Sequence, residues 1–301
     1  MGHDGRYAPS PSGPLHLGNL RTALLAWLFA RSAGARFLVR VEDLDRGRSR
    51  PEHERSQLAD LAAIGLDWDG EVVRQSERDA LYAAAITRLD TYPCYCTRAE
   101  IREAASAPHG RPGRYPGTCR ELTAAQRAQR EATGRPPALR LRADGARVAF
   151  EDRVLGRYEG VVDDIVVRRN DGTAAYNLAV VVDDADQGVG EVVRGADLID
   201  ATPAQLFLAE ALGLARPAYA HVPLVLGADG ARLAKRGHTR SGSGGVTLAD
   251  RRARGEDAEA VRTQLLESVG LPGALDEALA AFDPGALPRA PTVWAPAAVL
   301  R

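Results

Sequence analysis

Residues 6–21 read Arg-Tyr-Ala-Pro-Ser-Pro-Ser-Gly-Pro-Leu-His-Leu-Gly-Asn-Leu-Arg, and the fold follows from this stretch. Its prolines exclude a helix in the first part, because proline lacks the N–H donor and clashes with the preceding turn. Asn19 is a suitable N-cap, and a segment rich in Leu and Ala then predicts a helix to about Ser32. The stretch therefore predicts a strand over 6–10, then a loop, then a helix.

This loop delivers His16, Gly18 and unpaired backbone amides to a helix N-terminus, where phosphate binds well. Gly18 has no side chain, so a flat ligand can approach the backbone there. The Gly-x4-Gly-Lys-Ser/Thr spacing is absent, which excludes a P-loop. A second predicted strand over 36–41 completes a βαβ unit, and this unit indicates an α/β protein with a parallel sheet.

Lys235 is the only lysine among the 39 lysine and arginine residues of the chain. Lysine carries a compact point charge, whereas arginine is a planar fork, so a site that must neutralise a phosphate can require lysine. Lys235 lies between an apolar run and a glycine-rich loop, within Arg232-Leu-Ala-Lys-Arg-Gly-His238. The alternative interpretation is an ordinary surface lysine.

Together these motifs resemble a known family. Residues 9–19 are similar to the HIGH signature of class I aminoacyl-tRNA synthetases, in the form found in glutamyl-tRNA synthetases, and residues 232–236 are similar to a degenerate KMSKS loop. Between them, Arg40-Val-Glu-Asp-Leu-Asp45 is similar to the family's RIEDTD, and residues 175–184 to its TYHLANVVDD. The resemblance covers residues 6 to about 240 and implies the Rossmann-like nucleotide-binding fold of class I synthetases.

The resemblance implies a two-step reaction. The carboxylate of glutamate attacks the α-phosphate of ATP to give an acyl-adenylate, and a nucleophile on RNA then takes the acyl group. His16 and Lys235 would be the catalytic residues, since such chemistry depends on positioning and charge stabilisation. Magnesium would bridge the phosphate oxygens. The residues expected to bind ATP are His16, Gly18, Asn19 and Lys235; an ordinary loop histidine is the alternative for His16.

An amino-acid site for glutamate must hold two carboxylates and one ammonium. Arg6 and Arg194 have forked donors that suit carboxylates, and Glu42 can accept from the ammonium. Pairing with Arg40 is the alternative for Glu42. The resemblance implies that L-glutamate is bound by Arg6, Tyr7, Ala8, Pro9, Ser10, Glu42, Tyr176 and Arg194.

The three cysteines are Cys94, Cys96 and Cys119, too few for a disulfide framework. A structural zinc usually takes four ligands. Some glutamyl-type enzymes resemble this stretch, with Cys-x-Cys followed by Tyr-x3-Cys, which implies Cys94, Cys96, Tyr115 and Cys119 as ligands of Zn²⁺. Tyr95 and His109 are the other candidates for the fourth ligand, of which His109 is the chemically more usual, and three inert buried cysteines are the further alternative.

We expect one α/β fold interrupted by an insertion. The first half of the catalytic domain would span 1–91, an acceptor-type subdomain with the zinc site 92–168, the second half with the KMSKS-like loop 169–240, and a small helical region 241–301. Residues 52–65, 77–91, 121–134 and 202–213 read as helices. Residues 138–142, 146–150 and 222–226 read as strands, and 161–184 as β-rich with a turn at 170–172.

The net charge is −1, which argues against a general nucleic-acid coat protein. Residues 98–142, however, hold ten arginines and four glutamates. A local basic face suits a partner such as a folded RNA, although a solvated arginine-rich helix is the alternative. No apolar run reaches the ~18 residues of a membrane helix, and the first residues do not read as a signal peptide. We expect a cytoplasmic monomer that does not bind membranes.

Several positions depart from the glutamyl-tRNA synthetase pattern. The KMSKS-like loop has Arg232, Ala234 and Arg236 in place of the first lysine and both serines. Val180 stands where the family usually has Asn, which should remove a polar contact from the amino-acid site and weaken glutamate binding. Only 65 residues follow Arg236, which leaves no room for the large anticodon-reading domains of those enzymes.

The pattern therefore resembles the glutamyl-Q tRNA(Asp) synthetases, a truncated branch of the family. That resemblance implies activation of glutamate without tRNA and its transfer to the queuosine base at the wobble position of tRNA(Asp), with the anticodon stem-loop as the expected partner. The alternatives are a truncated glutamyl-tRNA synthetase that charges the 3′ end of tRNA(Glu), and a non-catalytic RNA-binding paralogue.

Overall fold

The computed structural model describes residues 4–101, 115–231, 233 and 246–294. Its centre is a seven-stranded sheet in the order β3-β2-β1-β9-β10-β6-β7. The strands are β1 (Asp4–Tyr7), β2 (Phe37–Val41), β3 (Val73–Arg74), β6 (Arg147–Asp152), β7 (Gly156–Val161), β9 (Val189–Gly195) and β10 (Ala218–Val222). All neighbours are parallel except the β6–β7 hairpin. This is the α/β sheet that the βαβ opening predicts.

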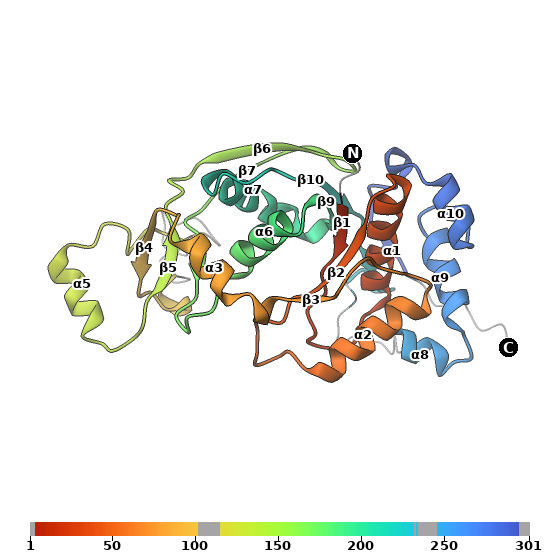
Figure 1. Cartoon of the computed structure of the whole chain (residues 1–301), viewed down its shortest axis with the longest axis horizontal. Coiled ribbons are helices and arrows are strands. Elements are labelled where there is room, and N and C mark those ends of the chain that lie inside the picture. The colour runs from red at the N-terminus through yellow and green to blue at the C-terminus, as the bar shows by residue number, and fades with distance from the viewer. Residues whose placement is uncertain (1–3, 102–114, 232, 234–245, 295–301) are drawn as a thin grey trace.

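Helices cover both faces of the sheet (Figure 1). On one side lies α1 (Leu17–Ser32), and on the other lie α6 (Tyr176–Asp186) and α7 (Thr202–Ala211). Helix α1 is buried over most of its surface, because it packs on β1 and is covered in turn by α9 (Ala258–Glu267) and α10 (Leu275–Ala281). Its apolar side chains therefore join two layers, and they dominate the main core.

Several further elements lie outside the seven-stranded sheet. They are α2 (Pro51–Ala63), η1 (Gln75–Glu77), α3 (Asp79–Ile86), η2 (Ala196–Ala201), β11 (Val225–Leu226), α8 (Leu248–Arg252), η3 (Pro284–Ala286) and β12 (Thr292–Val293). Strands β11 and β12 pair in parallel, so the end of the described chain is attached just before the KMSKS-like segment.

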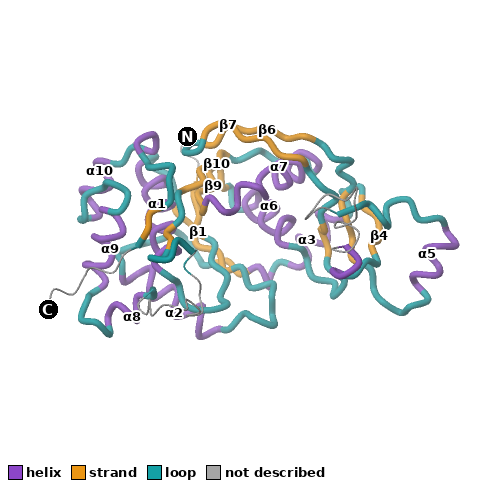
Figure 2. Tube along the Cα trace, turned by 180° about the vertical axis from the view of Figure 1, so that it is seen from behind, coloured by secondary structure: helices purple, strands orange, loops and turns teal. Residues whose placement is uncertain are grey.

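Part of segment 92–168 forms a second unit beside the main sheet. Here β4 (Thr91–Cys94), β5 (Ala138–Leu141) and β8 (Val166–Arg168) make a three-stranded antiparallel sheet, and α5 (Ala124–Glu131) lies at the far end of the molecule (Figure 1). Strands β6 and β7 do not belong to this unit, because they extend the main sheet along its edge (Figure 2). The domain bounds themselves stay a prediction.

Three sequence expectations for local structure were wrong. Residues 176–186 form helix α6 rather than a strand, because one face of this segment packs on α7 and β9, and this packing outweighs the β preference of its valines. Residues 222–226 are split between β10 and β11 by Pro223. The N-cap of α1 is His16, and Asn19 is the third helical residue.

The helices expected at 52–65, 77–91, 121–134 and 202–213 correspond to α2, α3, α5 and α7. The expected turn at 170–172 is also present. Within the described ranges, none of the helices has the length and apolarity needed to cross a lipid bilayer.

Candidate active site

A cavity of about 580 Å³ opens at the carboxyl ends of the parallel strands. It lies where β1 is flanked by β2 on one side and β9 on the other, so the strand order runs outward in both directions from this point. In open parallel sheets, loops diverge at such a reversal and leave a crevice for ligands. The topology alone thus selects this edge as the binding site.

The cavity gathers residues from five separate segments of the chain. Every described residue predicted to bind ATP or glutamate lines it: Arg6, Tyr7, Ala8, Pro9, Ser10, His16, Gly18, Asn19, Glu42, Tyr176 and Arg194. Thr22, Asp197, Leu198, Leu224 and Leu233 complete much of its wall. Val180 is not among the lining residues; it is 2% exposed and packs in an apolar cluster with other residues of α6 and α7.

His16 is fixed by a reciprocal cap at the start of α1. Its Nδ1 accepts the backbone N–H of Asn19 at 3.2 Å, and Oδ1 of Asn19 accepts the backbone N–H of His16 at 3.2 Å. Since Nδ1 is an acceptor, the proton of the neutral ring is assigned to Nε2. The cap therefore orients His16 as a donor through Nε2, next to a helix N-terminus that favours anions.

The side chain of Arg6 is fixed by a buried carboxylate. Its Nε and Nη2 donate to the two oxygens of Asp184 on α6, at 3.1 and 3.2 Å. The same carboxylate accepts from Arg40 Nη1 at 2.7 Å. Burial raises the pKa of Asp184, but Arg40 and Arg6 outweigh this effect and hold that pKa below its usual value. Asp184 thus remains charged and fixes the fork of Arg6 at the cavity wall.

Arg194 is held even more completely. Its Nε donates to Nε2 of His221 at 3.1 Å, and its Nη1 to Oε1 of Gln205 at 2.7 Å. Its Nη2 donates to Oγ1 of Thr202 at 2.7 Å and to the backbone oxygen of Leu198 at 3.3 Å. Most of the five N–H groups of an arginine are thereby used inside the protein. Arg194 therefore presents a narrow, strictly oriented face to the cavity.

Glu42 supplies negative charge on the same wall. Burial raises the pKa of Glu42 above its ordinary value, while Arg40 and Arg6 oppose the shift. The nearest atom of Arg40 lies 3.6 Å from Oε1 of Glu42, beyond hydrogen-bond distance. An incoming ammonium would stabilise the ionised form of such a buried carboxylate, so the pairing with Arg40 does not saturate Glu42.

Lys235 lies outside the described residues, and so does His109. The described residues on either side of the Lys235 segment nevertheless lie at this end of the molecule. Leu233 lines the cavity. Val246 lies at the start of α1, where its backbone oxygen accepts the backbone N–H of Leu17 at 2.8 Å.

Comparison with known proteins decides the family. The family model of the class I tRNA synthetases (E and Q), catalytic domain, matches residues 4–264. The chain belongs to this family. It is a class I tRNA synthetase, a ligase.

Individual relatives agree with this assignment. The synthetase is 62% identical to the glutamyl-Q tRNA(Asp) synthetase of Nocardia farcinica, over 97% of this chain and 93% of that protein. It is 49% identical to the protein of that name from Symbiobacterium thermophilum, over 95% and 94%. The crystal structure of a glutamate-tRNA synthetase from Elizabethkingia anophelis superposes with a TM-score of 0.84 at 27% identity, covering 98% of this chain and 68% of that one.

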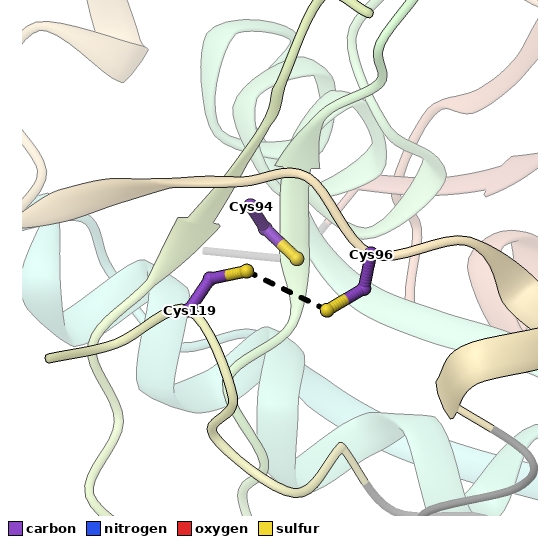
Figure 3. Close-up of side chains that lie close together, drawn as sticks. All are labelled: Cys94, Cys96 and Cys119. Carbon is purple, nitrogen blue, oxygen red and sulfur yellow. Dashed lines mark hydrogen bonds between the residues drawn. The ribbon is translucent and has the colours of Figure 1, made fainter. Parts of the chain in front are cut away.

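The three cysteines of the synthetase converge in the smaller unit (Figure 3). Their sulfur atoms lie within 4.8 Å of one another, and the Cys96 and Cys119 sulfurs are 3.5 Å apart. The Tyr115 hydroxyl lies 3.4 Å from the Cys94 sulfur and 3.9 Å from that of Cys96. Tetrahedral zinc requires sulfur–sulfur separations of about 3.8 Å and sulfur–oxygen separations of about 3.5 Å, so these donors fit the ion.

The surroundings of Tyr115 favour the neutral phenol over the phenolate. Burial raises the pKa of Tyr115, and the neighbouring Cys94 raises it further. Its hydroxyl oxygen accepts the backbone N–H of Cys119 at 2.8 Å, and the Arg140 guanidinium lies 3.7 Å from the ring centre. A bound cation would have to lower that pKa before the oxygen could ligate as an anion.

A second cavity, of about 610 Å³, adjoins the first. The two share Ser10, Glu42 and Tyr176 as lining residues. Arginines line much of the second cavity: Arg48, Arg98, Arg135, Arg140 and Arg169. Of these, Arg48 and Arg169 pair with neighbouring aspartates. Elsewhere in the arginine-rich segment, Arg120, Arg130 and Arg142 also form ion pairs with carboxylates, so all five are partly neutralised.

Sequence reasoning missed the groups that hold the two arginines. The motifs include Asp184 without assigning it a partner, and they do not single out His221, Asp152, Thr202 or Gln205. One signal was available for His221, because a histidine inside the buried strand 218–222 must find polar partners. Nothing in the sequence named those partners.

Proposed function

We propose that this protein activates L-glutamate with ATP in the absence of tRNA and transfers it to the queuosine base at the wobble position of tRNA(Asp). The observation that carries the proposal is the cavity at the strand-order reversal, where His16 lies with Arg6, Glu42 and Arg194. Relatives matched over more than nine tenths of their length carry the name of this activity, which supports the choice of acceptor.

In the first step, a carboxylate oxygen of glutamate attacks the α-phosphorus of ATP, and the bond to the bridging oxygen of pyrophosphate breaks. His16 donates from Nε2 to the α-phosphate as its negative charge grows, and Lys235 neutralises the phosphates. Arg6 and Arg194 bind the carboxylates of glutamate, Glu42 its ammonium, and Ser10 and Tyr176 donate neutral hydrogen bonds. Magnesium bound with ATP would neutralise part of the phosphate charge.

In the second step, a hydroxyl of the queuosine cyclopentene ring attacks the acyl carbon. The bond to the adenylate oxygen breaks, AMP leaves, and the hydroxyl proton passes to solvent or to the AMP phosphate. We assign the second cavity to the RNA, because it adjoins the first at Glu42 and Tyr176 and arginines line it. Guanidinium groups suit RNA phosphates.

We further propose that Cys94, Cys96, Tyr115 and Cys119 hold one structural zinc, with Tyr115 preferred to His109 because its hydroxyl already adjoins two of the sulfurs. The ion would stabilise the smaller unit and take no part in the chemical steps. The protein would act as a cytoplasmic monomer.

The test uses ATP, labelled glutamate and a set of tRNAs. We expect glutamate-dependent pyrophosphate exchange without tRNA, and transfer to tRNA(Asp) that contains queuosine. Unmodified tRNA(Asp) transcript should accept nothing, whereas tRNA(Asp) trimmed at its 3′ end and an isolated modified anticodon stem-loop should both accept glutamate. Charging of tRNA(Glu) alone, dependent on its 3′ end, would instead identify a truncated glutamyl-tRNA synthetase. Absence of exchange with any tRNA would favour the non-catalytic paralogue.

A further inference from the structure

A series of buried, hydrogen-bonded side chains crosses neighbouring strands of the sheet and reaches the cavity. It runs from Asp152 at the end of β6, through His221 on β10, to Arg194 on β9. Cα partners in the parallel β9–β10 register include Arg194 and His221, so the two side chains leave neighbouring strands at the same level. The side chains of His221 and Asp152 are both fully buried.

Hydrogen-bond donors around Asp152 keep its side chain ionised. Its Oδ1 accepts the backbone N–H groups of Val154 and Leu155 at 3.0 and 2.9 Å, and its Oδ2 lies 2.6 Å from Nδ1 of His221. Burial raises the pKa of Asp152, but hydrogen bonds from His221 and Leu155 outweigh burial and lower that pKa overall. A carboxylate can only accept, so the proton of the neutral ring is assigned to Nδ1 of His221.

That assignment leaves Nε2 of His221 as an acceptor. It faces Nε of Arg194 at 3.1 Å and Oγ1 of Thr202, also at 3.1 Å. Thr202 in turn accepts from Nη2 of Arg194 at 2.7 Å. The guanidinium is thus clamped along one edge by His221 and Thr202, and a change in the protonation of His221 acts directly on its orientation.

We propose that His221, oriented by Asp152, is the positioning residue that aims Arg194 at a substrate carboxylate, and that glutamate binding requires its neutral ring. This inference rests on the proposed role of Arg194 in binding glutamate. A proton added at Nε2 would turn the acceptor into a donor that faces a permanent positive charge. Arg194 would then lose its Nε partner and turn about its remaining contacts with Gln205 and Thr202, away from the substrate carboxylate.

The surroundings of His221 favour the neutral ring at neutral pH. Facing charges are Asp152 on β6, Arg194 on β9 and Asp197 on η2; Tyr219 of the same strand stacks on the ring, with the centres 5.9 Å apart. Burial lowers the pKa of His221 below its ordinary 6.5, the bond to Asp152 opposes this, and Arg194 lowers it further. The unfolded chain therefore binds this proton at a higher pH than the folded protein does. As the pH falls below about 6.5, both the stability of the fold and the contact between His221 and Arg194 should weaken.

The test measures the KM for glutamate and for ATP in tRNA-free pyrophosphate exchange between about pH 8 and pH 5, across the histidine range. In the wild type, the KM for glutamate should rise as pH falls while the KM for ATP changes little. Glu42 also titrates in this cavity, so variants at His221 are needed to separate the two groups.

His221→Asn and His221→Gln form a matched pair. The asparagine amide reaches Asp152 but has no acceptor at the Nε2 position, whereas the glutamine amide places an untitratable acceptor there. We expect the KM for glutamate to rise about tenfold or more at pH 7.5 in His221→Asn, as for the loss of a charge-assisted hydrogen bond. His221→Gln should stay within about threefold of the wild type and lose most of the pH dependence.

The outcomes separate this inference from the proposed function. If the wild type shows no glutamate-dependent exchange, the proposed function fails, whatever His221 does. If the wild type is active but His221→Asn leaves the KM for glutamate unchanged, or alters the two KM values equally, the positioning role is refuted. If His221→Asn fails to fold in a thermal melt, the wild type and His221→Gln still provide the test. The inference is overturned if the KM for glutamate depends on pH in the same way in both proteins.

Discussion

The orientation of single side chains decides how this site can act. His16 donates through Nε2 because Asn19 fixes its other nitrogen, and this arrangement depends on Gly18 between them. A Cβ atom at Gly18 would lie 3.1 Å from both Cε1 and Nδ1 of His16 and 3.5 Å from Cβ of Val225. The glycine therefore leaves the space that the imidazole occupies.

Gly18→Ala should displace the His16 ring and lower the rate of pyrophosphate exchange by about tenfold or more, since it disturbs a donor to the transition state. Stability should change little, because the roughly 0.5–1 kcal/mol by which alanine favours a helix over glycine offsets the weakened His16 cap. Thermal melts and exchange assays would measure the two effects. Gly47→Ala is the matched control, as its nearest neighbour is at an ordinary 3.4 Å. Unchanged exchange in Gly18→Ala would contradict the assigned role of the glycine.

Lys235 is the second residue on which catalysis should depend. Lys235→Ala should cut adenylate formation roughly 10²–10³-fold, as for the loss of one charge partner of the transition state. Lys235→Arg should also be impaired, because a planar fork does not replace a point charge. Single-turnover adenylate formation would measure both variants. Full activity in the arginine variant would show that the lone lysine has no special role.

Helix α6 shows how an element connects a core to a site. Asp183 and Asp184 lie on its buried side, where Asp183 accepts from Tyr82, Gln75 and Arg78 while Asp184 accepts from Arg6 and Arg40. The helix thereby fixes Arg6 in the cavity wall by charge, while its apolar residues pack on α7 and β9. Asp186, also on α6, is half-exposed and pairs with Arg78 only at the surface.

Asp184→Asn should lower the free energy of unfolding by about 3–5 kcal/mol, because it removes the buried carboxylate that Arg6 and Arg40 share. It should also raise the KM for glutamate through Arg6. Asp186→Asn is the control on the same helix and should cost at most about 1 kcal/mol. Urea denaturation measures both. Equal losses in the two variants would mean that burial of the Asp184 pair does not matter.

The smaller unit should depend on the proposed zinc more than the catalytic sheet does. We expect about one zinc per chain, and Cys119→Ser should lower the zinc content and the thermal stability of this unit. Tyr115→Phe keeps the ring that stacks on Arg140 but removes the hydroxyl, so it should weaken zinc binding, whereas His109→Ala should not. Metal analysis of purified protein checks each variant. Zinc-free wild type, or loss of zinc only in His109→Ala, would be the contrary result.

At the scale of the whole molecule, the proposed function assigns a different step to each of the two cavities. One lies at the end of the parallel sheet, and the other, arginine-lined, adjoins it beneath the smaller unit. The division separates activation, which involves small charged ligands, from acceptor binding, which involves a polyanion. Ionic strength should distinguish these steps.

Transfer of glutamate to a modified anticodon stem-loop should weaken steeply as salt rises, while tRNA-free exchange changes little. The variant Arg98→Gln with Arg135→Gln should reduce the slope of log affinity against log salt, by about 0.7–0.9 for each RNA phosphate that the variant no longer neutralises. Arg127→Gln on α5, exposed and away from the second cavity, is the control. An unchanged slope in the double variant would place the RNA on another surface.

The sequence by itself determined the local parts of this protein. The strand, the proline-rich loop and helix α1 follow from short-range rules, and the segment from Arg6 to Asn19 carries its own cap and its own site residues. Only the tertiary structure decided that residues 176–186 form a helix, because packing on α7 and β9 outweighs the preference of its valines.

The tertiary structure alone also decided what holds each arginine. Arg6 finds its carboxylate 178 residues away at Asp184, and the ring that orients Arg194 comes from a different strand. Short-range rules describe how a chain turns and which face it buries. They do not say which buried charge will meet which partner. Those partners are decided only when distant segments pack together and each buried polar group must find a hydrogen bond.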